Sequence, residues 1–263
     1  MAAIGIPYMP LEFERLWNEY VPQHLLPRLH GFELMMAPYA IAHMKIGLKL
    51  AGTGYRFRTE ERARVYLTNS LEPPTDDKKQ REFAEWAPAL AHEAKAVNAV
   101  KRHARFTVVI GNPPYSKSSQ NQGIWIEELM EDYKRTVRAA ETQIQALSDD
   151  YSKFLRLGHF NLQQAEVGIL GFITNNGYLD GPLFRDMRHS MMTSFEAIRI
   201  VNLHGDSRKQ FTPPDGMADE NVFDIQQGVA ISIFWSTQQS STVSEVRYSE
   251  MWGSREERYP SST

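Results

Sequence analysis

Asn112-Pro113-Pro114-Tyr115 is the segment of this chain whose residue types could do chemistry. It follows an apolar run, Phe106 to Ile110, and precedes a polar stretch, Ser116 to Asn121. This pattern predicts a buried strand that ends in a rigid polar loop, and ligands bind at such strand ends in open α/β sheets. Asparagine offers one acceptor and two donors, the prolines fix φ, and tyrosine adds a flat face with a polar tip. Such a loop could hold the exocyclic amine of a planar base and stack on its ring.

The tetrapeptide resembles the catalytic motif of the amino-group methyltransferases that modify adenine N6 in DNA. The alternative interpretation is a plain Pro-Pro turn after a strand. Four residues match often by chance, so the tetrapeptide alone does not decide between a methyltransferase motif and a plain turn.

Length and composition are those of a globular chain. The 263 residues suggest one large domain or two small ones, with an ordinary 42% hydrophobic and 23% charged content. No apolar run approaches the roughly 18 residues of a membrane-spanning helix. No signal peptide is visible at the N-terminus. The lack of cysteine excludes disulfides, cysteine-ligated zinc and cysteine nucleophiles, and we expect a cytoplasmic protein without a membrane partner.

The net charge of -3 does not show the basic balance that is common in DNA-binding proteins. Residues 101–120 nevertheless contain Lys101, Arg102, Arg105 and Lys117 and no acidic residue. This is either a basic patch around the key loop or a solvated strand edge. The histidines show no metal-ligand spacing, so we predict no metal site.

The hydrophobic pattern predicts strands that alternate with helices of ten or more residues, which is typical of an α/β, doubly wound and mostly parallel sheet. We expect one domain over residues 1–237 and a weakly ordered polar tail over 238–263. A long loop is expected at 205–221. The expected helices are 11–29, kinked at Pro22, and 38–50, 83–102, 123–147, 150–165 and 183–195. The expected strands are 31–34, 65–68, 108–110, 168–174, 198–203 and 228–235.

Glu33 ends a short predicted strand and precedes a helix, a position from which an acidic residue binds the ribose hydroxyls in nucleotide-binding α/β folds. A carboxylate suits that role because it is a double acceptor. The alternative is an acidic residue that stabilises the start of a helix. The surrounding stretch, Leu25 to His43, is similar to the methyltransferase part of the helicase–methyltransferase enzymes of single-polypeptide, type I-like restriction–modification systems. The resemblance continues in order at Val65 to Glu72, the Asn112 loop, Gly171 to Asp180, Asn202 to Lys209 and Asp219 to Ala230.

The resemblance implies a Rossmann-like class I methyltransferase sheet and S-adenosylmethionine as the methyl donor. Glu33 would then hold the ribose, while Leu34 and Met35 would pack against the adenine ring of the cofactor. Asn69 and Ser70 end the next strand, where related enzymes often carry an Asp that accepts from the adenine amino group. The alternative for Asn69 is a turn residue that uses its side chain locally.

The resemblance also implies double-stranded DNA as the partner. Asn112 and the Pro113 carbonyl would accept hydrogen bonds from the target amine, and Tyr115 would stack on an adenine flipped out of the duplex. Phe223 is the candidate for a second aromatic wall, with a core phenylalanine as the alternative. Asn175, Asn176 and Tyr178, at the end of a predicted strand, are assigned only a role in shaping the pocket.

One motif of the family does not occur in this sequence: the glycine-rich loop that follows the first strand and backs the methionine end of the cofactor. We therefore expect an N-terminally truncated sheet that lacks its central strand. Such a sheet would expose two unpaired edges, so it either pairs with another polypeptide or rearranges. Three functions stay open: an adenine-N6 methyltransferase or a piece of one, a non-catalytic methyltransferase-like scaffold or partner subunit, and methylation of another planar amide or amine.

Overall fold

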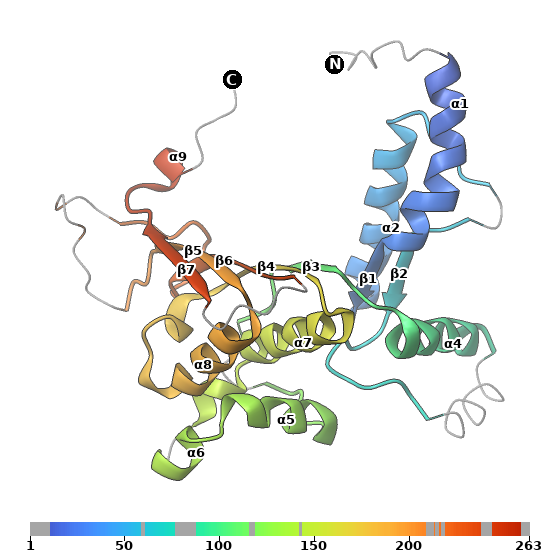
Figure 1. Ribbon diagram of the computed structural model, residues 1–263. Coiled ribbons are helices and arrows are strands. Elements are labelled where there is room, and N and C mark those ends of the chain that lie inside the picture. The colour runs from blue at the N-terminus through green and yellow to red at the C-terminus, as the bar shows by residue number, and fades with distance from the viewer. Residues whose placement is uncertain are drawn as a thin grey trace. The chain divides into compact units, whose positions relative to one another are not determined.

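The computed structural model describes residues 11–58, 61–76, 88–115, 119–141, 144–208, 213, 216, 219–237 and 244–258. The chain forms two compact units, Met1–Ala104 and Arg105–Thr263, which are described separately (Figure 1). The methyltransferase-like domain proposed for residues 1–237 spans the first unit and most of the second. None of the described helices is long and apolar enough to cross a membrane.

The first unit contains a two-stranded parallel sheet in which Glu33 pairs with Leu67. Its elements are α1 (Leu11–Tyr20), β1 (His30–Glu33), α2 (Met36–Ala51), β2 (Arg64–Leu67) and α4 (Pro88–His103). After α1 the chain continues as a π-helical turn, Val21–Leu25, that contains Pro22. Proline has no backbone N–H to donate, which disrupts the regular α-helix at Pro22, where the sequence predicts a kink, and helical turns continue to Arg28. The predicted start of the third helix, residues 83–87, lies outside the described residues.

The second unit contains a five-stranded sheet with the order β3-β4-β6-β5-β7. Its strands are β3 (Val108–Gly111), β4 (Gly168–Asn175), β5 (Ala197–His204), β6 (Val229–Ser236) and β7 (Glu245–Glu250). Its helices are α5 (Ile124–Met130), α6 (Val137–Ala140), α7 (Asp150–Ala165), α8 (Arg185–Ser194) and α9 (Arg255–Arg258). Figure 1 shows α5, α7 and α8 on one face of this sheet. The α/β fold class is confirmed.

The sheet of the second unit is mixed rather than mostly parallel. β3 runs parallel to β4, and β5 parallel to β7, but β6 is antiparallel to both β4 and β5. The physical reason is the connection from β5 to β6, whose described residues contain no helix. A parallel neighbour needs a crossover, usually a helix, whereas an antiparallel neighbour needs only a loop.

Two further elements differ from the sequence-based expectation. Part of the segment expected to be a weakly ordered tail forms β7, whose residues are all exposed, so apolar alternation could not reveal it. The helix expected over 123–147 is interrupted: α5 ends at Met130, a 3₁₀ turn covers Glu131–Tyr133, and Lys134 leaves helical backbone geometry. The side chain of Lys134 is buried at 3% exposure. A continuous helical pattern does not predict this inward turn.

The main core of the chain lies between α7, α8 and the sheet of the second unit. Leu155 and Leu162 of α7 belong to the same buried cluster as Leu170 of β4, and the first and last of these are completely buried. Burial of a leucine contributes about 2 kcal/mol relative to exposure. This packing gives β4 a fixed position, and both β3 and β6 pair with β4.

Gly168→Ala is expected to destabilise the second unit. Gly168 has φ +157°, and a Cβ atom there would lie 2.3 Å from the backbone oxygen of Thr107. Because a backbone oxygen cannot move aside cheaply, we expect the free energy of unfolding to fall by about 2 kcal/mol or more. Urea denaturation followed by circular dichroism measures the change. Gly171→Ala on the same strand is the control, because its Cβ would meet no atom closer than 3.8 Å. Equal losses in both variants would contradict the steric argument.

Candidate active site

Asn112-Pro113-Pro114-Tyr115 begins directly after β3, at the carboxyl end of the strand, as predicted. Asn112 is exposed, Pro113 is buried and Tyr115 is partly buried. The Tyr115 hydroxyl donates to Asn112 Oδ1 at 3.2 Å. An amide oxygen has two lone pairs, so Asn112 can accept a second hydrogen bond while this one is kept.

The strand that carries this loop is not buried, which corrects the sequence-based prediction. Val108 is 60% exposed and Ile110 is 79% exposed. β3 is the first strand of its sheet and pairs only with β4 among the described strands. Val109, which lies between Val108 and Ile110, packs on the main core, so these two residues point to the opposite face of the sheet, where their side chains are uncovered.

Tyr115 packs against a small apolar cluster at the same end of the sheet. The cluster consists of Leu203, Val222 and Val229, and Phe223 also packs against it. Burial raises the pKa of Tyr115 to about 12, so its hydroxyl stays protonated and remains a donor at neutral pH. The structure therefore brings the two predicted aromatic residues to one cluster, and Phe223 is partly rather than fully buried.

The ends of β4, β5 and β7 are joined by a chain of side-chain amides and hydroxyls. Asn176 Nδ2 donates to Asn202 Oδ1 at 3.0 Å, and Asn202 Nδ2 donates to the Tyr248 hydroxyl at 3.0 Å. Tyr248 in turn donates to Glu250 at 2.7 Å. The sequence pointed to Asn176 but not to Asn202 or Tyr248. A possible signal was an asparagine near the end of each of two predicted strands.

The residues predicted to bind the cofactor lie in the first unit. Glu33 is the last residue of β1, and its Oε1 accepts from the backbone N–H of Met35 at 2.9 Å. Its backbone oxygen accepts from Thr68 N–H at 2.7 Å, which ties the ends of β1 and β2 together. Leu34 and Met35 are 64% and 63% exposed. One carboxylate and two uncovered apolar side chains thus share the carboxyl edge of this sheet.

Asn69 and Ser70 follow β2 at the same edge, and both are partly buried. Asn69 Oδ1 accepts from Leu71 N–H at 3.0 Å, and Asn69 Nδ2 donates to Glu72 at 3.2 Å. Both ends of this amide thus make local contacts. Asn69 forms the turn that was the alternative interpretation of this residue.

Two of the basic residues at 101–117, Lys101 and Arg102, contact the loop after β2. Lys101 Nζ donates to the backbone oxygens of Asn69 and Glu72, and Arg102 donates to that of Thr75. These contacts hold the end of α4 to the loop after β2. Arg105 belongs to the second unit, and Lys117 lies outside the described residues.

The sequence model of the Eco57I restriction-modification methylases matches residues 28–211. The chain belongs to this family. The matched region contains the Asn112 loop, Glu33 and Asn69, and it confirms the resemblance inferred from the sequence blocks. No curated protein matches the chain significantly.

Solved structures with a similar fold include restriction-modification enzymes. The ATP-dependent Type ISP enzyme LlaBIII bound to DNA superposes with a TM-score of 0.69 at 22% identity, covering 92% of this chain and 16% of that one. The DrdV–DNA complex gives 0.69 at 24% identity, covering 94% and 23%. The nuclease-deletion mutant of LlaGI with a DNA substrate mimic gives 0.68 at 21% identity, covering 89% and 21%. This chain therefore spans less than a quarter of each of these enzymes.

Replacement of Asn202 by leucine is expected to weaken the side-chain hydrogen bonds that join the ends of β4, β5 and β7. Leucine has a similar volume but leaves the Asn176 amide, in a residue only 8% exposed, without this acceptor. An unpaired buried polar group costs about 1–3 kcal/mol, so unfolding should occur at lower urea concentration. Tyr248→Phe is the comparison, because Tyr248 is 50% exposed and water can replace its hydroxyl contact. A larger loss in Tyr248→Phe than in Asn202→Leu would contradict the argument.

Proposed function

We propose that this chain is an S-adenosylmethionine-dependent DNA adenine-N6 methyltransferase domain of a restriction–modification enzyme acting in the cytoplasm. The observation that carries the proposal is the Asn112–Tyr115 loop at the carboxyl end of β3, inside the region matched by the methylase family. The similar structures of LlaBIII, DrdV and LlaGI are complexes with DNA or a DNA mimic, which supports DNA as the substrate class.

Asn112 and the Pro113 carbonyl supply the chemistry on the base side. An exocyclic amine is a poor nucleophile because its lone pair is delocalised into the ring. Two acceptors that take its two N–H groups favour a tetrahedral nitrogen with its lone pair on the opposite side. The amine nitrogen would then form the new N–C bond as the sulfur–methyl bond of the bound donor breaks, the electron pair of that bond would stay on the sulfur of S-adenosylhomocysteine, and one amine proton would go to solvent. No strong base is needed, so positioning and electrostatics provide the rate enhancement.

Tyr115 and Phe223 supply the apolar side of the base pocket. Tyr115 packs on the cluster of Leu203, Val222 and Val229 and keeps its ring partly exposed. Stacking of a flipped base on an aromatic ring offsets part of the energy of leaving the duplex. The contact between the Tyr115 hydroxyl and Asn112 Oδ1 holds the acceptor oxygen in place.

The carboxyl edge of β1 and β2 fits part of the cofactor. S-adenosylmethionine, when bound, would supply an electrophilic methyl group. Glu33 keeps one carboxylate oxygen on Met35 N–H, and the carboxylate has acceptor capacity left for ribose hydroxyls. The exposed side chains of Leu34 and Met35 would cover one face of the adenine ring. Asn69 follows β2 at the same edge and stays the candidate for the contact with the adenine amino group, beside the turn that its amide makes.

A second polypeptide would complete this site. Among the described strands, β1 pairs only with β2 and β3 only with β4. Both sheets thus have an unpaired edge, and the exposed Val108 and Ile110 make the β3 edge apolar. Unpaired edges invite a further strand. We propose that the partner carries the glycine-rich first motif and a target-recognition domain.

The competing function is a non-catalytic, methyltransferase-like scaffold or partner subunit. One observation favours it: the predicted cofactor-binding residues lie on one sheet and the Asn112 loop on another, and no described strand pairing joins the two sheets. Both functions keep the fold, so only an activity measurement separates them.

Methyl transfer to DNA tests the proposal. The chain is incubated with methyl-labelled S-adenosylmethionine and double-stranded DNA, with and without a second polypeptide that carries the glycine-rich loop. We expect label in adenine N6, and a loss of at least about 100-fold in Asn112→Ala because one of the two acceptors is removed. Gln120→Ala, an exposed residue near the loop, is the control and should keep full activity. Absence of label in every combination would support the scaffold.

Cofactor binding by the chain alone gives an independent result. Because the residues that would hold the methionine end are not found in this sequence, we expect isothermal titration with S-adenosylmethionine to show dissociation constants well above the micromolar range. Micromolar binding by the isolated chain would overturn the need for a partner. Glu33→Gln then tells whether the carboxylate contacts the ligand, since loss of charge-assisted hydrogen bonds weakens binding.

A further inference from the structure

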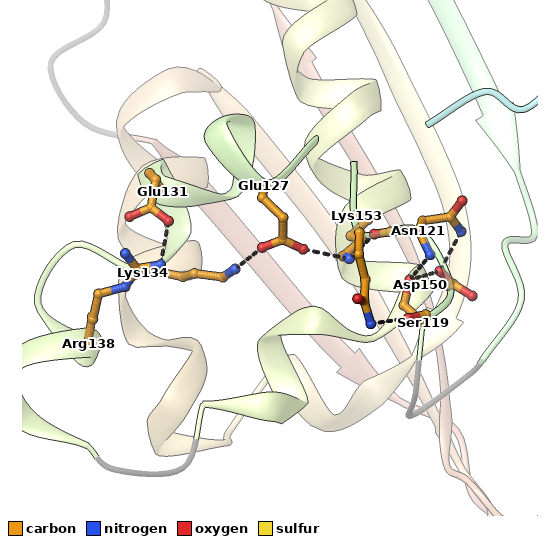
Figure 2. Close-up of polar contacts among 9 residues, drawn as sticks. Ser119, Asn121, Glu127, Glu131, Lys134, Arg138, Asp150 and Lys153 are labelled. Atoms are coloured by element: carbon orange, nitrogen blue, oxygen red, sulfur yellow. Dashed lines mark hydrogen bonds and ion pairs between the residues drawn. The ribbon is translucent and has the colours of Figure 1, made fainter. Parts of the chain in front are cut away.

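A buried polar cluster at the start of α7 contacts the segment that follows the Asn112 loop. Asp150 is 8% exposed, Lys153 is 1% exposed and Ser119 is 7% exposed. Burial of charged side chains is costly unless they are paired, so such clusters are kept only where their contacts matter. Figure 2 shows these side chains pointing toward one another and toward Asn121.

Asp150 is the centre of the contacts to the loop. Its Oδ1 accepts from Ser119 Oγ at 2.5 Å and from Asn121 Nδ2 at 2.9 Å. Ser119 Oγ in turn accepts from the backbone N–H of Asn121 at 3.0 Å. One carboxylate therefore holds two residues that lie only a few positions after Tyr115.

Lys153 fixes the same segment from the next turn of α7. Its ammonium donates to the backbone oxygen of Asn121 and forms an ion pair with Glu127 at 2.7 Å. Glu127 also pairs with Lys134 at 2.8 Å. Burial alone would raise the pKa of Glu127, but hydrogen bonds from the two lysines outweigh it and hold that pKa below its usual range. Glu127 therefore stays ionised at neutral pH and keeps Lys153 in place.

Two described attachments flank the loop that carries the candidate chemistry. Before it, Gly111 is in register with Phe172 of β4. After it, beyond residues 116–118, which lie outside the described residues, Ser119 and Asn121 are bound to α7, which packs against β4 through Leu155 and Leu162. Both attachments lead to the same rigid strand. Loss of the polar contacts of α7 would release Ser119 and Asn121 but would leave the pairing of β3 with β4 intact.

We propose that Asp150 is a positioning residue that sets the geometry of the Asn112–Tyr115 loop by holding Ser119 and Asn121. This inference rests on the proposed function. Asp150 itself does not touch substrate. A purely structural role would lower stability without changing turnover at temperatures where the protein is folded, whereas a positioning role lowers turnover in folded protein.

Asp150→Ala and Asp150→Asn test the positioning role in the full chain, assayed with the polypeptide required for activity. We expect Asp150→Ala to lower kcat by roughly 10- to 100-fold, since small misplacements of reacting groups have effects of that size. The KM for S-adenosylmethionine should stay unchanged, because Glu33, Leu34 and Met35 lie in the other unit. Asp150→Asn keeps an acceptor oxygen and should recover a large part of the activity.

Ser119→Ala provides a milder variant in case Asp150→Ala does not fold. It removes one of the two donors to Asp150, so it should lower kcat by a smaller factor in the same direction. Glu131→Gln is the matched control, because the Glu131–Arg138 pair in Figure 2 is about half exposed and does not contact the loop. Unchanged kcat in folded Asp150→Ala or Ser119→Ala, or a loss as large in Glu131→Gln, would overturn the proposal.

Amide hydrogen exchange separates this inference from the proposed function. Asp150→Ala should accelerate exchange at Asn121 and Gln122, whose backbone N–H groups are bonded within the held segment. Faster exchange in a protein that transfers no methyl group would refute the methyltransferase while leaving the anchor intact. Unchanged exchange together with unchanged kcat in an active enzyme would refute the anchor alone.

Discussion

The packing of α7 against β4 is the contact on which the second unit depends. Leu155, Leu162 and Leu170 form part of one buried cluster there, and β4 pairs with both β3 and β6. Because interiors are packed as densely as organic crystals, an element held this way does not drift. The candidate chemistry is attached to this contact twice, once through β3 and once through the polar cluster at the start of α7.

That polar cluster shows how charge can be buried close to a reactive loop. Lys134 and Lys153 share the carboxylate of Glu127, while Asp150 is occupied by neutral donors from Ser119 and Asn121. Removing one partner of such a buried pair leaves an uncompensated charge, which costs more than the pair contributes. The arrangement therefore specifies one geometry for the segment after the loop rather than adding much stability.

The family assignment and the geometry point to the same division of labour. Residues 28–211 match the methylase family, and the LlaBIII and LlaGI restriction-modification enzymes, which have a similar fold, are several times longer than this chain. Under the proposed function, Glu33 with Leu34 and Met35 would contact the nucleoside of the cofactor, and Asn112 with Tyr115 would contact the target base. The described strands hold these two surfaces in separate sheets, each with an edge open to a further strand.

Local sequence alone determined the features that depend on a few neighbouring residues. These are the Asn112–Tyr115 loop after a strand, Glu33 at the end of another, the break at Pro22 and the alternation of helices and strands. Tertiary structure decided what depends on neighbours distant in sequence. β6 runs antiparallel to β5, and no described helix joins the two strands. The residues of β7 are all exposed, so this strand is recognisable only by its pairing with β5. Val108 is exposed because it points to the face of the sheet opposite the main core, and Lys134 turns inward because Glu127 and the end of α5 meet it there. The hydrophobic pattern of the sequence indicates which face of a helix or strand a side chain occupies. Whether that face is buried, and which charged groups pair, depends on which elements pack together.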